Sequence, residues 1–455
     1  MERIARWTGV WASVLLLLAL SSTDSPARAD EVGDGAEGEG QGEEDRSDEG
    51  DAAPAEPELL ERIGELERRL AELEAGRGAG EPDDDEIAAA LAADAATAEE
   101  AGSETQPIPR FLQSMNPNIS FIADVGFAWF SVDEPLMIGG HDPTSSGFFL
   151  QQLELAIGAS VDPYFRFDGN IVFSQFGVEV EEVYATTLGI PGGLQLRAGQ
   201  FLTRFGRINA THPHTWDFVD QTLVIGKFMG GEGNRGLGLE LSWLTPLPWY
   251  VELSAAGING RGEATARSFR GANDLGFRDP RDLEYVLALK QFWPLGSDVS
   301  LSWGLSWALG PNGTGLGNRT DIFGTDLYLK IRPIRAGRYV ELRWQTEAML
   351  RNRQVPGALN RDWGGYTYVV LRFAKRWEAG MRYELVSGTE GDDLDPEWTS
   401  LRQRIAPQLT FRPSHVTRVR LQVDVDNPTW HETPWQVGGM LAFEFNVGAH
   451  GAHAF

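Results

Sequence analysis

The sequence of 455 residues contains no cysteine, only four lysines and a clear deficit of positive charge. Without cysteine the chain has no disulfide framework, no cysteine-ligated metal centre, no cysteine nucleophile and no lipoprotein acylation site. Its 66 acidic and 39 basic residues give a net charge of −27, which excludes nucleic-acid binding by bulk electrostatics. No uninterrupted apolar run after residue 29 reaches the roughly 18–20 residues that span a bilayer, so a helical membrane protein is also excluded.

The negative charge is concentrated in one segment of the chain. Residues 30–105 carry 27 acidic and five basic side chains, whereas residues 106–455 are nearly balanced. The sequence therefore predicts one large folded domain that follows an acidic N-terminal segment.

Residues 1–29 have the pattern of an export signal. Arg3 and Arg6 supply the positive start, residues 10–20 supply an apolar stretch, and residues 27–29 form an Ala-Arg-Ala cleavage motif. The alternative is an uncleaved membrane anchor, but the apolar stretch is shorter than a span requires. We expect the mature protein to begin at Asp30.

The acidic segment is divided by one short heptad pattern. Residues 30–57 are rich in Gly, Glu, Asp and Ala and are predicted to be disordered. Residues 58–76 are predicted to form a short coiled coil, although a frayed, solvated helix is about as consistent with so few heptads. Residues 77–110 are predicted to be an acidic, alanine-rich linker. The apolar seam consists of Leu59, Ile63, Leu66, Leu70 and Leu73.

From residue 111 onward the apolar residues repeat with a period of two. Between Val299 and Leu309 every second residue is Val, Leu or Trp, and the residues between them are Ser, Gly or Ala. In the strands that begin near Val340, Trp377 and Val419, every charged side chain falls on the opposite face. An Arg that faced lipid near mid-membrane would cost about 2–4 kcal/mol, so this partition fits a barrel with lipid outside and water inside.

We predict sixteen antiparallel strands that form a transmembrane β-barrel over residues 111–455. Short connections with Pro or Gly alternate with long ones, which is typical of an outer-membrane barrel and not of a soluble sandwich, the alternative that the apolar alternation alone would also allow. The predicted long connections include residues 132–146, 202–235, 258–281, 310–320, 351–362, 387–399 and 426–434. The strands are predicted to start near Asn118, Gly147, Tyr164, Val178, Leu194, Gly236, Trp249, Asp282, Asp298, Asp321, Tyr339, Gly364, Arg376, Leu401, Val416 and Trp435.

The body of the chain resembles the phosphate-selective porin O and P family, and porins more generally. The resemblance rests on the preceding short coiled coil, the terminal Phe455 and two segments, GFFLQQLELAIGASVDPYFRFDGNIVF (147–173) and LQLRAGQFLTRFGR (194–207). It implies a sixteen-stranded, trimeric channel with a loop folded into the lumen and cations that bind anions. With only four lysines in the chain, the lysine-rich anion funnel expected of that family is not matched.

Two sets of basic residues are candidates for the pore lining. The first belongs to the third and longest outer loop, which we expect to fold inward; the alternative is a loop over the mouth with solvated charges. The second comes from consecutive strands with lumen-facing parity. Its alternatives are a basic stripe and salt bridges with Glu378, Glu384 and Asp424, and the salt bridges are the preferred interpretation. The candidates are Arg204, Arg207, Lys227 and Arg235 in the loop, and Arg372, Arg382, Arg404, Arg412, Arg418 and Arg420 on the wall.

No motif in the sequence supports an enzyme. His212 and His214 stand in a His-Pro-His loop without the helical spacing or second cluster of a strong metal motif, and a surface loop is the preferred interpretation. No catalytic residue, cofactor or metal is therefore predicted.

The sequence predicts an outer-membrane porin, with outer-membrane lipid, small solutes or ions, and two further copies of the chain as partners. The protein would pass small hydrophilic solutes or ions by passive diffusion, anions such as phosphate among them, with its N-terminal arm in the periplasm. The alternative is a structural barrel that tethers the envelope through this acidic, coiled-coil arm.

Overall fold

The computed structural model describes residues 117–174, 177–262, 264–270, 277–333 and 339–448. The predicted signal peptide, acidic segment, coiled coil and linker lie outside these residues, as does Phe455, so those predictions remain untested.

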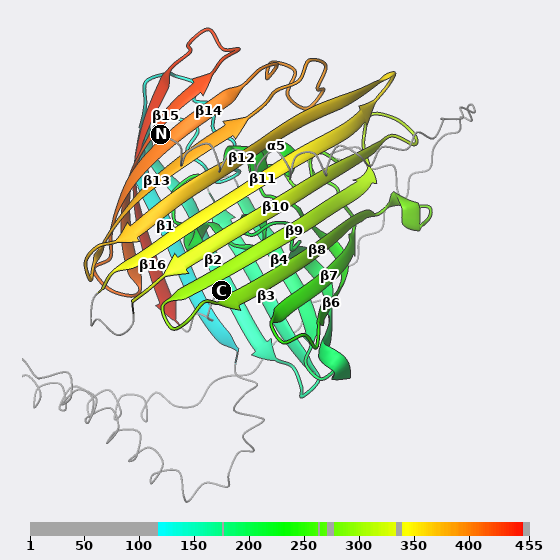
Figure 1. The fold of residues 1–455 in the computed structure, drawn as a ribbon. Helices are drawn as coiled ribbons and strands as arrows, with labels where there is room; N and C mark the ends of the chain where they lie inside the picture. Colours follow the sequence, from blue (N-terminus) through cyan, green and yellow to red (C-terminus); the bar gives the residue numbers. More distant parts are fainter. Residues whose placement is uncertain (1–116, 175–176, 263, 271–276, 334–338, 449–455) are drawn as a thin grey trace, which may run out of the picture. The chain divides into compact units, whose positions relative to one another are not determined.

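The described residues form sixteen strands in one closed, antiparallel barrel, in which each strand pairs with its sequence neighbours and β1 pairs with β16 (Figure 1). The predicted fold class and strand number are confirmed. The strands are β1 (Asn118–Phe130), β2 (Gly147–Ser160), β3 (Phe165–Ser174), β4 (Gly177–Thr187), β5 (Leu194–Leu202), β6 (Arg235–Leu244), β7 (Tyr250–Ile258), β8 (Glu284–Pro294), β9 (Val299–Pro311), β10 (Arg319–Ile331), β11 (Glu341–Val355), β12 (Ala358–Arg372), β13 (Trp377–Val386), β14 (Arg402–Phe411), β15 (Thr417–Pro428) and β16 (Gln436–Gly448).

The two faces of the barrel differ in chemistry, because successive side chains of a strand point to opposite faces. Along β15 the buried residues include Arg418, Arg420, Gln422 and Asp424, and the alternating Leu421 and Val423 are exposed on the outside. Other outward residues are large and apolar, as on β1 and β6. These exposed residues include Phe121, Phe127, Trp129, Leu237, Leu239, Leu241 and Trp243.

Most connections alternate in length as predicted, and the outer connection between β3 and β4 is the short exception. One predicted loop needs correction. The predicted outer loop at 351–362 is wrong: β11 continues to Val355, β12 starts at Ala358, and only residues 356–357 turn the chain. Gly357 has a φ of +77°, which a tight turn between two strands tolerates in glycine. The polar residues here look like a loop in the sequence because they point inward as pairs, such as Arg351 Nε with Asp362 Oδ1 at 2.8 Å.

The described helical segments are short and lie in the connections between strands. The α-helix α5 (Leu223–Phe228) lies within the barrel in Figure 1. The 3-10 helices are η1 (Pro191–Gly193), η2 (Ile208–Ala210), η3 (Pro213–Thr215) and η4 (Pro280–Asp282). Within the described part of the chain, no helix has both the length and the apolar character needed to cross a membrane.

Candidate functional site

The third outer connection, residues 203–234, folds into the barrel, and we call it the inward loop. Its residues 218–230 are all buried, although they lie between two strands of the wall and not within a strand. Backbone amides of the loop donate to wall side chains on several strands: Gly206 to Ser306 at 2.9 Å, Ile208 to Glu347 at 2.8 Å and Leu223 to Glu384 at 2.6 Å. The predicted inward fold of this loop therefore agrees with its placement in the structure.

An apolar side of the inward loop packs against strands β12 and β13. Phe218 lies 5.3 Å from Tyr368, centroid to centroid, and belongs to one buried cluster with Val224 and Phe228. Helix α5 contacts both strands. Complete burial of a Phe or Val side chain contributes about 1.5–3 kcal/mol, so these residues favour the inward position over a solvated one.

Asp220 lies at the centre of the polar side of the loop. Its two carboxylate oxygens accept hydrogen bonds from Arg382 on β13 and Arg404 on β14, each at 2.6 Å, and Oδ1 also accepts one from Gln422 on β15 at 2.5 Å. Burial would raise the pKa of Asp220, but the two guanidinium groups outweigh it and hold the pKa below its ordinary value. The loop is thus attached to three wall strands through one ionised side chain.

Lys227 of α5 is fully buried in a second charged cluster. Its Nζ lies 3.3 Å from Asp395, 3.8 Å from Asp362 and 3.9 Å from Asp392, and 4.3 Å from the centre of the Trp398 ring. Burial lowers the pKa of Lys227 despite these carboxylates. The connection between β13 and β14, which carries Asp392, Asp395 and Trp398, therefore packs on α5.

The remaining loop candidates occupy three different environments. Arg204 pairs with Glu240 at 2.9 Å and also with Glu252. Arg235, which the structure places at the start of β6, is buried and pairs with Glu179. Arg207 is only partly buried, stacks over Tyr328 at 3.8 Å from the ring centre and donates to Gln345 at 3.1 Å.

The wall candidates face inward and are paired with acids. Arg372 and Arg412 both contact Glu378, the latter at 3.0 Å. Arg418 pairs with Glu444 and donates to the Trp216 carbonyl at 2.7 Å, and Arg420 pairs with Asp124 at 2.5 Å. The expected salt bridging on this wall is therefore present, and the loop backbone shares in it.

Unlike the other candidate cations, Arg207 has no acidic partner in direct contact within the described part of the chain, and the same is true of Lys290 on β8. Among the described residues, neither makes an ion pair within 4 Å, and both are partly buried. Lys290 shares the inward-facing side of β8 with the buried residues Glu284 and Val286. Lys290 was not among the sequence candidates, although the alternation along β8 was the signal that could have identified it. These two cations are the best candidates for contact with a solute.

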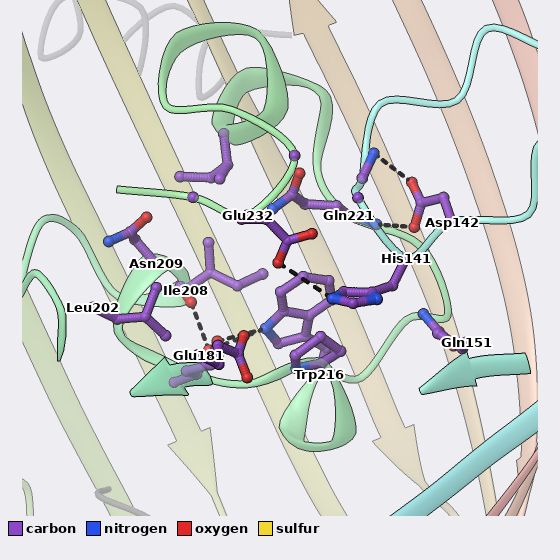
Figure 2. Close-up of a pocket in the computed structure, with 17 residues that line it drawn as sticks. His141, Asp142, Gln151, Glu181, Leu202, Ile208, Asn209, Trp216, Gln221 and Glu232 are labelled. Carbon is purple, nitrogen blue, oxygen red and sulfur yellow. Dashed lines mark hydrogen bonds and ion pairs between the residues drawn. The ribbon is translucent and has the colours of Figure 1, made fainter. Parts of the chain in front are cut away.

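A second outer connection, residues 131–146, packs on the inward loop around a cavity of about 30 Å³ (Figure 2). His141 Nε2 lies 3.2 Å from Glu232, and Asp142 accepts a hydrogen bond from the Gln221 amide at 3.2 Å. Burial alone would lower the pKa of His141, but the hydrogen bond and charge of Glu232 raise it to about 9. Burial and the charge of Asp220 raise the pKa of Asp142 to about 7.

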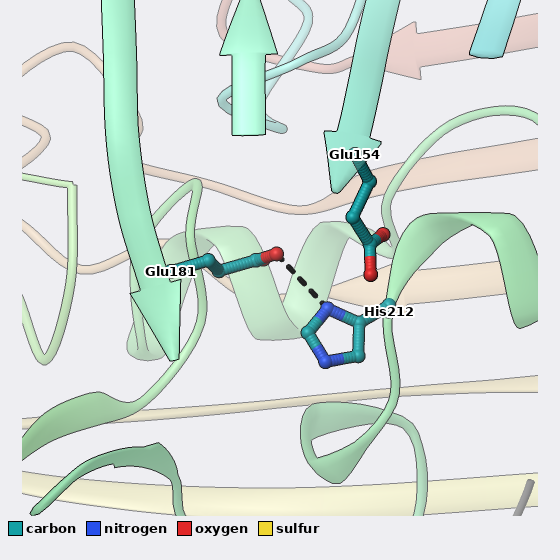
Figure 3. Close-up of side chains that lie close together, drawn as sticks. All are labelled: Glu154, Glu181 and His212. Carbon is teal, nitrogen blue, oxygen red and sulfur yellow. Dashed lines mark hydrogen bonds and ion pairs between the residues drawn. The ribbon is translucent and has the colours of Figure 1, made fainter. Parts of the chain in front are cut away.

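The histidines of the inward loop are inside the barrel and not on its surface, which corrects the preferred interpretation of the His-Pro-His segment. His212 contacts Glu181 and Glu182 of β4, and His214 contacts Glu154 of β2 at 2.8 Å. Figure 3 shows Glu154, Glu181 and His212 converging from separate segments. Sequence spacing could not reveal this cluster. Its three segments, Glu154, Glu181–Glu182 and His212–His214, are separated by 27 or more residues in the chain.

Comparisons with known proteins bear on the family and the fold. No family model matches the chain, so membership of the phosphate-selective porin family stays a prediction. An uncharacterized protein of Aquifex aeolicus is 33% identical over 354 residues, which cover 70% of this chain and 73% of that protein.

Solved structures with a similar fold share little sequence with this chain. OprB of Pseudomonas putida aligns with a TM-score of 0.50 and 10% identity, over 74% of this chain and 96% of that one. An anion-selective porin from Comamonas acidovorans has a TM-score of 0.49 and 13% identity, over 73% of this chain and 99% of that one. The outer-membrane channel DcaP of Acinetobacter baumannii has a TM-score of 0.49 and 10% identity, over 73% of this chain and 97% of that one. The OprB comparison shows the fold alone, that of a sixteen-stranded outer-membrane barrel.

Proposed function

The chain belongs to the same family as the uncharacterized Aquifex aeolicus protein, and we propose that it is an outer-membrane porin for passive diffusion of small hydrophilic solutes or ions. The observation that carries the proposal is the combination of an apolar outer face, an inner face rich in charge and a loop that folds inside the barrel against that inner face. A sixteen-stranded barrel is wide enough to enclose an aqueous channel, and an inward loop narrows it.

We further propose that the channel prefers anions, phosphate included, through Arg207 and Lys290. Most other inward cations are compensated: Arg204, for example, is held by Glu240 and Glu252. A cation without a carboxylate in direct contact contributes more positive potential to its surroundings than a paired one. Asp326 lies near both Arg207 and Lys290 and offsets part of their charge without an ion pair to either. Tyr328 and Gln345 hold the Arg207 guanidinium in place without neutralising it.

Single-channel recording in a planar bilayer tests both parts of the proposal. Stable conductance steps support a pore, a reversal potential of the anion-selective sign under a salt gradient supports the preference, and block by added phosphate supports a phosphate site. Silence from correctly folded protein would contradict the porin function, and would leave a barrel closed by its own loop.

Substitutions of Arg207 and Lys290 sharpen the test. Arg207→Ala should shift the reversal potential toward cation selectivity, and Lys290→Ala should add to that shift. Lys375→Ala is the matched control, because it removes the same charge from an exposed position in the short connection between β12 and β13 and should leave the reversal potential nearly unchanged. If Arg207→Ala and Lys290→Ala both leave the reversal potential unchanged, these residues do not set the selectivity.

The setting of the channel follows from the same proposal. The apolar outer face fits outer-membrane lipid, the long connections would face outward, and the chain before β1 would form a periplasmic arm. We propose a homotrimer without catalytic activity. Native mass spectrometry of the detergent-solubilised protein measures the number of copies, and a monomer would contradict the trimer.

A further inference from the structure

Three carboxylates and two imidazoles meet inside the barrel where the inward loop crosses β2 and β4. Single ligand atoms of Glu154, Glu181 and His212 all lie within 4.8 Å of one another. Glu154 and Glu181 are 1% and 4% exposed, and Figure 3 shows their carboxylates directed toward the same side of the His212 ring. From these residues we propose a divalent cation site that ties the inward loop to the wall.

The spacing of the ligand atoms suits an ion. Glu181 Oε2 lies 2.9 Å from His212 Nδ1. Two ligands at about 2.0–2.1 Å from one cation are roughly 3 Å apart when they occupy neighbouring coordination positions. The pair therefore needs only a small adjustment to accept an ion at the place that a proton now bridges.

The opposite edge of the His212 ring provides independent support. Glu182 Oε2 lies 2.8 Å from His212 Nε2. The side-chain amide of Asn170 lies 2.8 Å from the same nitrogen, and turned over it would present its oxygen as a second acceptor there. A histidine that ligates a metal through one nitrogen usually donates its other N–H to a carboxylate, which fixes the tautomer and the ring orientation. Glu182 is placed to do this, and it leaves Nδ1 directed at Glu154 and Glu181.

A buried amide with spare acceptor capacity stands beside the carboxylates. Gln152 is 0% exposed, its Nε2 lies 3.4 Å from Glu154 Oε2, and its Oε1 has no hydrogen-bond partner among the described residues. The two ends of a Gln amide are assigned and not observed. With the amide turned over, Oε1 would occupy the position beside Glu154 and could act as a further oxygen ligand.

The charges also favour a cation. Glu154, Glu181 and Glu182 bring three negative charges into a buried region, where they contact the imidazoles of His212 and His214. Two protonated imidazoles would offset only two of these charges, and a divalent cation would supply two positive charges in place of the proton between Glu181 and His212. Buried charges require pairing or coordination. The cavity of about 30 Å³ that Glu181 lines has room for a water ligand (Figure 2).

The donor types indicate which cation would bind. One imidazole nitrogen with two carboxylates and an amide oxygen suits a transition-metal ion such as Zn²⁺ or Mn²⁺, whereas Mg²⁺ and Ca²⁺ prefer oxygen ligands alone. We therefore expect Zn²⁺ to bind to the folded barrel more tightly than Mg²⁺, with one site per chain that depends on His212.

Calorimetric titration of the folded protein in detergent with Zn²⁺ is the direct experiment. His212→Ala and Glu181→Gln should abolish the tight site, and Glu182→Gln should weaken it about 10- to 100-fold because it only orients His212. His415→Ala, at an exposed turn, is the matched control and should bind as the wild type does. Equal Zn²⁺ affinity in the wild type and in the folded Glu181→Gln variant would overturn the proposal.

A measurement on the unaltered protein keeps the proposal testable if these variants fail to fold. Anomalous diffraction at the zinc edge from wild-type crystals soaked in Zn²⁺ should place one ion between Glu154, Glu181 and His212. Zinc only at surface histidines, or no zinc, would refute the site. Neither experiment depends on conductance, so the cation site and the porin function can fail separately.

Discussion

Arg382 on β13 donates a hydrogen bond of 2.6 Å to Asp220 of the inward loop, and both side chains are almost completely buried. The two residues are 162 positions apart, so the contact exists only in the folded barrel. Arg404 binds the other oxygen of the same carboxylate. This arrangement makes Asp220 a central polar anchor of the inward loop, beside its apolar packing and its backbone hydrogen bonds to the wall.

Replacement of Asp220 should therefore release the loop. Asp220→Ala would leave Arg382 and Arg404 buried without their common partner, and loss of one member of a buried ion pair costs about 3–5 kcal/mol. We expect a lower temperature for the heat-induced gel-mobility shift, together with noisier or larger single-channel currents.

The matched control is Asp133→Ala, which removes an exposed carboxylate from another outer connection. It should change neither the unfolding temperature nor the current. If Asp220→Ala behaved in the same way, the Asp220 contacts would not hold the loop.

The contact between His141 and Glu232 should make stability depend on pH. The folded-state pKa of about 9 is higher than the ordinary value of 6.5, and Glu232, Glu181 and Glu179 are the acids that act on the ring. Protonated His141 thus stabilises the fold fully below pH 6.5, and this contribution is lost as the pH rises through about 9. Its upper limit is about 3.5 kcal/mol, at ~1.4 kcal/mol for each pKa unit.

Thermal unfolding of the wild type and of His141→Gln between pH 6 and pH 10 measures this effect. The difference between the two proteins should be largest at pH 6 and should shrink toward pH 10. A difference that stays constant over this range would show that His141 acts through packing and not through its charge.

A charged substitution on the outer face should destabilise the barrel only where the side chain contacts lipid. Leu239 on β6 is 58% exposed, and Leu316, in the connection between β9 and β10, is 77% exposed. In a bilayer, Leu239→Arg should cost about 2–4 kcal/mol if it lies near the membrane centre, whereas Leu316→Arg should cost little. Folding yield into lipid vesicles distinguishes the two, and equal yields would argue against a lipid-facing β6.

The end of α5 should depend on a glycine. Gly230 has a φ of +111°, and a Cβ at this position would meet the backbone carbonyl of Ala264. Gly230→Ala should therefore destabilise the barrel by about 1–3 kcal/mol or more. Gly317→Ala is the control, since Gly317 also has a positive φ, +85°, but has open space around it. Similar denaturant midpoints for the two variants would indicate that the positive φ alone causes the destabilisation and that the contact with Ala264 adds nothing to it.

The alternation of apolar and polar residues was enough to determine the barrel. Most predicted strand starts lie within two residues of the observed ones, and inward parity for residues such as Arg382 and Arg420 followed from the period of two. The start of β12 was missed by six residues because its first inward residues, Asn360 and Asp362, are polar and pair with neighbours across the barrel wall and outer connections.

Parity gives the face of a residue but neither its height in the barrel nor its partner. The sequence could therefore place Arg404 on the lumen wall without showing that Asp220, 184 residues earlier, would neutralise it. In the same way, Glu154, Glu181 and His212 carry no common motif, and only barrel closure brings them together.

The sequence by itself determined a closed β-barrel with an apolar outside, because strand periodicity is local and is repeated in every strand. The tertiary structure alone decided which charges remain available in the lumen. That outcome depends on long-range packing of the inward loop, whose buried Phe218 and Asp220 select their partners from strands far away in the chain.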